Sequence, residues 1–544
     1  MPEPSEVAEQ RAILEGVVAF QEAEQAKYEA LDDYTALAKT FGLATEPHHP
    51  GIPWFDFEDD KWPYRRMAEH LDVDNGKDKC LFAIRGIGKS VLALMLQGKY
   101  ILKDHLHTLR IGSEAKLEVV KRSIWMRDQL VRLEPEYGPF RGTGEWGKER
   151  FTIIRQAGGV LDETVTLTSP DSPGTGAHPR SFLIDDGVGD IAEQSIAKME
   201  AGVDWFKRLG SQELAGTRTW VVGTFRMGWN IYRYILENIE KGLRLRTVGR
   251  GVQLHEGKQF DIMVVRDKDE NGELVFPGMD EKYLDNKRIR VGEAQYKTQF
   301  QMILPGDEDT TFNSDSFVWA SEPPKDTPLR TYIFTDTATS TGKTKHTSMS
   351  AIAAISKAPD GKAYVREMHM GKMSPDKVPD LIVRLFLRWN AEKVVYENTG
   401  PAAAYMSAVR KYAEAQGIPK SRIHGMFKVV GRPSDKHYRI QSYLAPHCDQ
   451  HDLCICKTVA KSVIHVGEDN RMEGLLGSSA EDYRYGAGGS WDGLDLLADV
   501  FGEDGAGNVI FKPPHEKANP RPPMNYLELK AEMARRLKGR RGVF

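Results

Sequence analysis

The segment 83–90, AIRGIGKS, combines glycines, a lysine and a hydroxyl in the order that phosphate binding requires. Backbone N–H groups can curl around a phosphate only where no side chain collides, and Gly86 and Gly88 give that freedom. Lys89 is placed to reach the β- and γ-phosphate oxygens, and the Ser90 hydroxyl to hold Mg²⁺. An apolar stretch precedes the loop and an amphipathic helical pattern follows it, so the positive end of a helix would face the phosphates. The pattern predicts a nucleotide site, although alanine occupies the first position, where such loops commonly have glycine.

A phosphate loop requires an acidic partner at the end of a buried strand, and the segment 180–187, RSFLIDDG, supplies one. We expect Asp185 to hold Mg²⁺ through water, and Asp186 to polarise the attacking water as general base. Many ATPases have glutamate at the second position. An apolar strand that ends in two aspartates is, by itself, more often a plain strand end. Its combination with the phosphate loop favours the catalytic interpretation.

A further strand pattern, 219–228, ends in a glycine followed by Thr224, a small hydroxyl residue that could sense the γ-phosphate and couple hydrolysis to movement. Transition-state charge on a phosphoryl group also needs a cation. Arg85, Arg180 and Arg226 are candidates for that role, and an arginine from a neighbouring subunit is a further one.

The second half of the chain has acids at positions that could share metal ions. Asp336 ends one strand pattern, Glu397 ends another, and Asp492 and Asp495 lie three residues apart at the start of a helix. Clustered carboxylates repel one another unless cations intervene, and a pair of Mg²⁺ ions about 4 Å apart can activate water and stabilise the leaving oxygen of a phosphodiester. Any one of these acids alone is ordinary. The order of strands and acids is that of RNase H-like nucleases.

The helix and strand patterns around these residues predict an α/β protein. Short apolar strands alternate with helical patterns from 55 to 245, which is typical of a parallel sheet with helices on both faces. SEPPKDTP, at 321–328, is the clearest linker. We therefore expect a helical arm, a P-loop NTPase core, a lid or linker subdomain, an RNase H-like nuclease domain and a basic tail, at 1–54, 55–245, 246–325, 326–510 and 511–544.

Within the nuclease half, the pattern predicts strands at 331–336, 350–357, 363–369 and 393–397, and helices at 375–390 and 402–415. The first 45 residues read as helical, a charged helix lies near 280–302, and Val264-Val265 and Leu274-Val275 are expected to form a hairpin around Asn271-Gly272.

Composition excludes several classes of protein. The 544 residues include four cysteines, too few for a disulfide scaffold and typical of a reducing compartment. No apolar run reaches the length of a membrane span, and the acidic N-terminus lacks a signal pattern. The net charge of −4 gives no general affinity for polyanions. Residues 511–544, however, hold nine Lys and Arg against three acidic residues, a local +6, which fits either a solvated end or a docking arm for DNA or an acidic partner.

The ordered set of motifs resembles the large subunit of tailed-bacteriophage terminases. The motifs are RGIGKS, LIDD, VVGT and the triplet FTDTA, YENTG and WDGLD, and the resemblance covers roughly residues 50–502. It implies an ATPase that drives double-stranded DNA through a portal into a procapsid, and a nuclease that cuts concatemeric DNA. It also implies ATP with Mg²⁺ in the first half and two Mg²⁺ or Mn²⁺ in the second.

The resemblance further implies partners and a place of action. These are concatemeric DNA, a portal protein, a small terminase subunit and a pentameric ring of this chain, in the host cytoplasm and transiently on the procapsid, with no membrane. The family pattern assigns the nucleotide site to Arg85, Gly86, Gly88, Lys89, Ser90, Asp185, Asp186 and Thr224, and the nuclease metals to Asp336, Glu397 and Asp492, with Asp495 as an alternative. Three departures are Thr175-Gly176 in place of Arg-Gly, His346-Thr347 in place of an aspartate, and Trp491-Asp492 in place of Asp-Asp.

Two other functions fit the same residues. A helicase-nuclease of DNA repair would need further motifs for gripping single strands, and none is evident. A packaging component with a degenerate nuclease would use the P-loop only to gate assembly. The cluster HCDQHDLCIC, at 447–456, suggests zinc, but its end reads better as a strand with Cys454 and Cys456 on one face. Aromatic residues before the loop, from Trp54 to Tyr64, suit either adenine stacking or core packing.

Overall fold

The computed structural model describes residues 4–43, 55–58, 62–155, 162–172, 176–193, 195–276, 278–304, 311–337, 349–374, 376–397, 400–431, 434–484, 489 and 491–502. The basic tail, Trp54, Thr175 and His346-Thr347 lie outside these ranges. The chain forms two compact units. The first contains residues 1–316, 434–450 and 478–491, and the second contains 317–433, 451–477 and 492–544.

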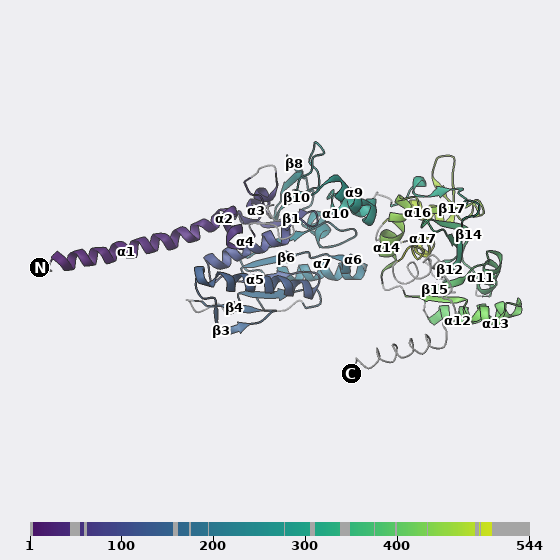
Figure 1. Ribbon diagram of the computed structural model, residues 1–544, viewed down its shortest axis with the longest axis horizontal. Coiled ribbons are helices and arrows are strands. Elements are labelled where there is room, and N and C mark those ends of the chain that lie inside the picture. The colour runs from purple at the N-terminus through teal and green to yellow at the C-terminus, as the bar shows by residue number, and fades with distance from the viewer. Residues whose placement is uncertain are drawn as a thin grey trace, which may run out of the picture. The chain divides into compact units, whose positions relative to one another are not determined.

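The first unit is built on a ten-stranded sheet with the order β3-β4-β5-β2-β6-β7-β1-β10-β9-β8. Figure 1 labels β8, β10, β1, β6, β4 and β3 of this sheet. The six central strands, from β5 to β10, run parallel, and antiparallel strands continue the sheet at both edges. The strands are β1 (Asp78–Ala83), β2 (Leu109–Gly112), β3 (Arg141–Trp146), β4 (Phe151–Ile153), β5 (Val165–Thr168), β6 (Ser181–Asp185), β7 (Arg218–Gly223), β8 (Arg246–Gly249), β9 (Val252–Glu256) and β10 (Phe260–Val265).

Helices connect and cover these strands. They are α1 (Pro4–Glu29), η1 (Ala30–Asp32), α2 (Tyr34–Thr40), α3 (Tyr64–Asp72), α4 (Lys89–Lys103), α5 (Lys116–Tyr137), α6 (Asp190–Glu193), α7 (Ile196–Gly210), α8 (Ile231–Arg233), η2 (Tyr234–Ile239), α9 (Glu281–Val291) and α10 (Glu293–Gln299). Strand β1 is apolar from Cys80 to Ala83 and β6 from Phe182 to Ile184, and both strands are buried at every position except Asp78, as expected for parallel strands covered on both faces. One continuous core joins them to α4, α5 and α7.

The strand order places β7 between β1, which leads into the phosphate loop, and β6, which ends in Asp185. This arrangement is that of P-loop NTPases with an additional central strand, so the predicted fold class of the first half is confirmed. The predicted helical start of the chain is also confirmed for α1 and α2. Helix α1 exposes Val17, Val18 and Phe20.

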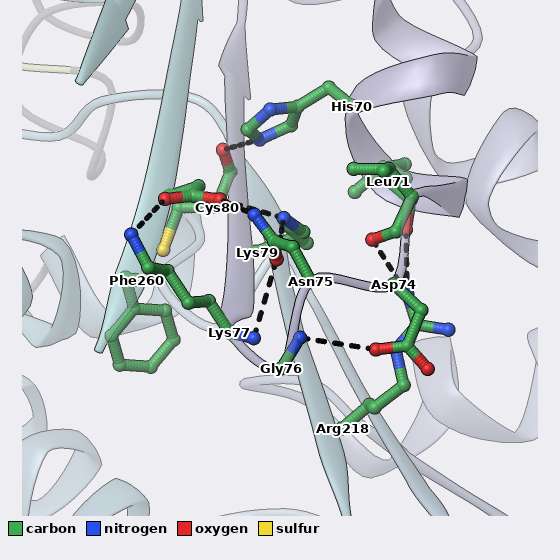
Figure 2. Close-up of polar contacts among 12 residues, drawn as sticks. His70, Leu71, Asp74, Asn75, Gly76, Lys77, Lys79, Cys80, Arg218 and Phe260 are labelled. Carbon is green, nitrogen blue, oxygen red and sulfur yellow. Dashed lines mark hydrogen bonds and ion pairs between the residues drawn. The ribbon is translucent and has the colours of Figure 1, made fainter. Parts of the chain in front are cut away.

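A buried ionic cluster joins the starts of β1 and β10. The Lys79 side chain is fully buried, and its Nζ donates to Asn75 Oδ1 at 2.7 Å (Figure 2). The same Nζ donates to Asp261 Oδ2 at 2.8 Å. Beside it, the ring of His70 donates from Nε2 to the carbonyl oxygen of Cys80 at 2.9 Å. Burial lowers the pKa of His70 to about 4, so the imidazole stays neutral in the folded protein at pH 7.

This pKa predicts acid sensitivity in a defined window. In the unfolded chain His70 takes up its proton near pH 6.5, but the folded chain resists it until about pH 4. Between these values the unfolded state binds more protons, so stability falls as the pH falls, by up to about 1.4 kcal/mol per pH unit. Urea unfolding measured from pH 7 to pH 4 checks this. His70→Gln should flatten the slope relative to the exposed His424→Gln control, and equal slopes would contradict the assignment.

The second unit is built on a seven-stranded sheet with the order β11-β17-β14-β13-β12-β15-β16. Its strands are β11 (Val318–Trp319), β12 (Arg330–Asp336), β13 (Ser350–Lys357), β14 (Ala363–Gly371), β15 (Lys393–Glu397), β16 (Phe427–Val430) and β17 (Leu453–Ile455), with β18 (His465–Val466) and β19 (Met472–Glu473) as a separate ribbon. Strands β12, β13 and β14 pair antiparallel, whereas β15 and β16 add to β12 in parallel. The core order 3-2-1-4-5 is that of the RNase H-like fold, which confirms the predicted class.

Helices α11 (Lys377–Arg388) and α12 (Gly400–Ala415) pack together against β12, β13 and β15. Helices α13 (Lys420–His424) and α17 (Asp492–Ala498) complete the unit, and α17 contacts β12 and β13. Helix α16 (Gly474–Asp482) begins in the second unit and ends in the first. The predicted strands and helices of this half are confirmed, two of the strands, 350–357 and 393–397, with identical bounds.

Residues 434–450 fold onto the first unit, although sequence patterns place them inside the second half. They form α14 (Lys436–Arg439), the π-helix η4 (Ile440–Leu444) and α15 (Ala445–Asp449). The backbone N–H of Glu293 donates to Asp449 Oδ2 at 2.9 Å, and Gln450 Nε2 donates to the carbonyl oxygen of Ile289 at 3.1 Å. The domain boundaries drawn from the sequence stay a prediction.

Two predictions of local structure need correction. Val264-Val265 does not pair with Leu274-Val275, because β10 already pairs with β1 on one side and with β9 on the other. The turn at Asn271-Gly272 instead closes a single bridge between Lys268 and Leu274. The charged helix near 280–302 is two helices, α9 and α10, interrupted at Gly292. In the described ranges, none of the helices has the length and apolar character to cross a membrane.

Candidate active sites

The loop between β1 and α4 has the backbone that a phosphate cradle requires. Gly86 and Gly88 adopt φ values of +84° and +79°, in the left-handed region where a side chain would be strained. Gly88 is also the N-cap residue of α4, so the free N–H groups of the first helical turn open toward the loop. Gly86, Gly88, Lys89 and Ser90 therefore lie on one turn with the backbone geometry that anion binding requires.

Lys89 folds back over this loop. Its side chain is almost fully buried, and Nζ donates to the carbonyl oxygen of Ile84 at 3.4 Å. Burial lowers the pKa of Lys89, while the charges of Asp186 and Asp185 oppose that shift. Within the described part of the chain this long hydrogen bond is the only one that the ammonium group makes, so it has donor capacity left for phosphate oxygens.

Ser90 and Asp185 meet across the sheet, although they lie far apart in the chain. Ser90 Oγ donates to Asp185 Oδ1 at 2.8 Å, and Asp185 is fully buried. Burial raises the pKa of Asp185, and the guanidinium of Arg122 opposes that shift. Arg122, from α5, donates from Nε to the other carboxylate oxygen, Oδ2. A hydroxyl beside a buried carboxylate at the mouth of a phosphate loop is a donor set suited to Mg²⁺, which prefers oxygen ligands.

The ion pair between Arg122 and Asp185 predicts how a substitution of Arg122 changes the free energy of unfolding. Arg122→Met leaves the Asp185 carboxylate buried without its cation, which should cost about 3–5 kcal/mol of unfolding free energy in the absence of nucleotide. Arg127→Met, on the same helix but paired with the exposed Asp128, is the matched control and should cost under about 1 kcal/mol. Urea unfolding compares the two variants. Mg²⁺ with ATP should restore part of the loss in Arg122→Met, and equal stability of both variants would contradict the pairing.

Asp186 occupies an unusual backbone position at the tip of β6. Its φ is +48°, a left-handed conformation that aspartate tolerates better than most residues. Its carbonyl oxygen accepts the Ser113 hydroxyl and the Glu114 N–H, each at 3.2 Å. The Asp186 side chain is 41% exposed, and its Oδ2 lies 3.7 Å from an Nη atom of Arg122. The strand tip is thus fixed by its backbone, and the carboxylate faces solvent.

Thr224 ties the tip of β7 to the end of β1. Its hydroxyl, which is buried, donates to the carbonyl oxygen of Ala83 at 2.8 Å, directly before the phosphate loop. A shift of either strand tip would change this bond. The predicted coupling role of Thr224 is consistent with its place, and it stays a prediction.

Two candidate arginines share one acidic partner. Arg85, in the loop, and Arg226, after β7, each bond to Asp190 Oδ1 at 2.8 Å, and Arg226 also reaches Glu193 Oε2 at 2.7 Å. The side chain of Arg85 is 44% exposed, whereas that of Arg226 is buried. Both lie at the edge of the sheet that holds Asp185.

Arg180 does not lie at this edge. It precedes β6, while Asp185 ends that strand, so the two residues are separated by about 16 Å of extended chain. Arg180 instead pairs with Asp104, at the end of α4. Arg180 therefore cannot reach a phosphate bound at the loop of the same chain. We remove it from the arginines that could stabilise transition-state charge within one chain.

Sequence reasoning missed several residues that the structure adds to this edge, namely Ser113, Glu114, Arg122, Asp190 and Glu193. Glu114 could have been found with the rule that identified Asp185, since it follows a short buried strand, β2. No sequence signal marks Arg122, which is one of many cations on α5.

The acids of the second unit lie at one edge of its sheet. Thr335 pairs with Tyr396 in the parallel β12–β15 ladder, so the next residues, Asp336 and Glu397, lie at the same height on neighbouring strands. In-register residues of neighbouring parallel strands point to the same face, and the two strand backbones are about 4.8 Å apart. Both side chains are half-buried.

Helix α17 brings the remaining acids to this edge. Asp492 Oδ2 accepts the backbone N–H of Met349 at 2.8 Å, directly before β13, whose Ala351 pairs with Asp336. Asp492 is buried, and Asp495, one turn later, is fully buried. The structure thus places Asp336 and Asp492 at the same end of adjacent elements.

The four acids can be compared with the requirements of a metal site. Within the described ranges, no group of three or more His, Cys, Asp or Glu side chains lies close enough to hold a metal ion. The donor chemistry suits Mg²⁺ or Mn²⁺, since all four candidates are carboxylates. One carboxylate oxygen of Asp492 accepts the backbone N–H of Met349, directly before β13. The assignment of Asp336, Glu397, Asp492 and Asp495 to metals stays a prediction.

Scans against family models and curated proteins gave no match. Solved structures similar to this chain include the large terminase of the thermophilic bacteriophage D6E, with 11% identity and a TM-score of 0.41, covering 81% of this chain and 98% of that one. The large terminase of bacteriophage HK97 has 10% identity and a TM-score of 0.29, covering 85% and 98%. The human cytomegalovirus terminase nuclease domain has 12% identity and a TM-score of 0.23, covering 32% and 83%.

Proposed function

We propose that this chain is the ATP-driven motor and the endonuclease of viral DNA packaging, a terminase large subunit. The observation that carries the proposal is the contact of Ser90 with Asp185 at the mouth of a left-handed glycine loop, on a sheet with a central strand between the two. The acids at the edge of a separate RNase H-like unit support the second activity. The order of the motifs along the sequence supports the presence of both activities in one chain.

In the first unit, the chain's own residues bind and orient ATP. The loop N–H groups and Lys89 hold the β- and γ-phosphates, and Ser90 and Asp185 would hold Mg²⁺, which neutralises phosphate charge. Arg85 or Arg226 stabilises the transition state once it leaves Asp190, unless a neighbouring subunit supplies the arginine. Thr224 links the strand tips and so passes a change at the phosphates to β7.

In the second unit, Asp336, Glu397 and Asp492 would hold two divalent ions, with Asp495 as the alternative third acid. Such a pair of ions lowers the pKa of water and stabilises the leaving oxygen of the DNA backbone. The acids would hold these ions at the sheet edge, and the ions would supply the positive charge that binds the scissile phosphate. Contacts to the DNA backbone rather than to bases fit a motor that must pass every sequence.

The proposed partners are concatemeric double-stranded DNA, a portal protein and a small terminase subunit. The proposed working form is a pentameric ring, docked transiently on a procapsid in the host cytoplasm. The proposed division of the chain is the one drawn from the sequence, with an arm at 1–54, an ATPase core at 55–245, a lid at 246–325, a nuclease at 326–510 and a tail at 511–544.

ATP turnover with different DNA substrates tests this proposal against a repair-type helicase-nuclease. Linear duplex DNA should stimulate hydrolysis, and the stimulation should fall steeply between 50 and 200 mM salt, roughly in proportion to the number of phosphate contacts. A forked duplex should not be unwound. Robust unwinding of the fork would favour the helicase, and turnover without any response to DNA would favour an assembly factor with a gating P-loop.

A further inference from the structure

The tip of β2 carries a further carboxylate, that of Glu114, which has no role in the proposed nucleotide site. Strand β2 lies directly beside β6 and runs parallel to it, with Gly112 paired to Ile184. Continuing the ladder brings Glu114 level with Asp186, and the Glu114 N–H donates to the Asp186 carbonyl oxygen at 3.2 Å. Glu114 therefore lies at the same sheet edge as Asp185 and the phosphate loop, one strand beyond β6.

The two oxygens of the Glu114 side chain differ in their surroundings. The carboxylate accepts backbone N–H groups of Ala192 and Gly189, and Oε2 packs so closely on Gly189 that a Cβ there would lie 2.1 Å from it. Among the residues that the structure describes, none donates a hydrogen bond to Oε1, which is buried. A buried carboxylate oxygen without a donor is costly in a folded protein, and such groups are found where function requires them.

Charge and burial suit this group to proton transfer. Burial raises the pKa of Glu114 to about 7, with the N–H of Ala192, Arg226 and the N–H of Gly189 opposing and Asp190 adding to the rise. A general base works best when its pKa lies near the working pH. The Asp186 side chain, by contrast, is 41% exposed, so its carboxylate faces both Arg122 and solvent.

We propose that Glu114, rather than Asp186, accepts the proton of the water that attacks the γ-phosphate. This inference rests on the proposed ATPase function. The water oxygen bonds to the γ-phosphorus while the bond from that phosphorus to the β,γ-bridging oxygen breaks. The bond's electron pair leaves with ADP, and one water proton passes to Glu114 Oε1. Asp186, held by its backbone at the tip of β6, orients the same water.

Single-turnover ATP hydrolysis tests this assignment. Glu114→Gln keeps an acceptor oxygen for the two N–H groups but cannot take the proton, so the rate constant should fall by at least about 100-fold. Binding of a fluorescent ATP analogue should stay within about threefold, which shows that the site is folded. The acidic limb of the wild-type pH profile, near pH 7, should disappear in this variant.

A second variant moves the carboxylate without changing its chemistry. Gly189→Ala puts a methyl group where Oε2 lies and should lower the rate by at least about tenfold, whereas Gly210→Ala, with open space around it, should match the wild type. The proposal is overturned if Glu114→Gln hydrolyses ATP within threefold of the wild type, or if the acidic limb is lost in Asp186→Asn instead. A wild-type chain that binds no ATP would refute the proposed function, which is a separate outcome.

Discussion

Lys89→Ala should lower ATP turnover by about 10²–10³-fold, the cost of removing one preorganised charge from a transition state. The ammonium group is almost fully buried over the phosphate loop, and its hydrogen bond to the Ile84 carbonyl oxygen is long enough to give way to phosphate. Alanine removes the charge and keeps the helical start of α4. Steady-state phosphate release measures the effect.

The matched control is Lys103→Ala, at the other end of α4. Lys103 pairs with Asp32 and faces solvent in part, so its loss should leave turnover within about twofold. Metal-dependent nicking of plasmid DNA should be unchanged in Lys89→Ala. Loss of both activities together would show that the two sites are not separable.

Asp336→Ala should lower the rate of metal-dependent cleavage by on the order of 10³-fold. Several kcal/mol of transition-state charge stabilisation depend on the ions that Asp336 would hold. Asp336 lies level with Glu397 at the end of β12, where each acid raises the local negative charge that attracts a cation. ATP turnover should be spared. Plasmid nicking at several Mn²⁺ concentrations measures the effect, since a weakened site is partly rescued by more metal.

Asp360→Ala is the control for this variant. Asp360 lies in the turn between β13 and β14, at the opposite end of the sheet, where it accepts the N–H of Lys362. Its removal should leave cleavage unchanged. Normal cleavage in Asp336→Ala would remove the nuclease assignment, and loss of cleavage in both variants would indicate a folding defect instead.

The parts of the sites that follow a local rule could be predicted from the sequence. A glycine loop between a buried strand and a helix, and an acid at the end of another buried strand, led to Ser90 and Asp185, which the structure brings to 2.8 Å. The rule works because parallel strands end at the same edge. The same reasoning could have excluded Arg180, which begins a strand rather than ending one.

The parts that depend on packing could not be predicted. Arg122 reaches Asp185 only because α5 packs on β2 and β5, and its cation looks like any other on that helix. Residues 434–450 read as part of the nuclease half, yet their bonds are to α9 and α10. The shared use of Asp190 by Arg85 and Arg226 likewise depends on the short helix α6, which has no strong sequence signal.

The central claim is that nucleotide hydrolysis in the first unit moves duplex DNA into a shell. The most direct measurement incubates the chain with portal-bearing empty shells, ATP and linear duplex DNA, and then measures DNA that resists DNase. The account predicts protected DNA that grows with time for the wild type and for Asp336→Ala, and none for Lys89→Ala. Protection by Lys89→Ala equal to the wild type, or hydrolysis by the wild type without any protected DNA, would contradict it.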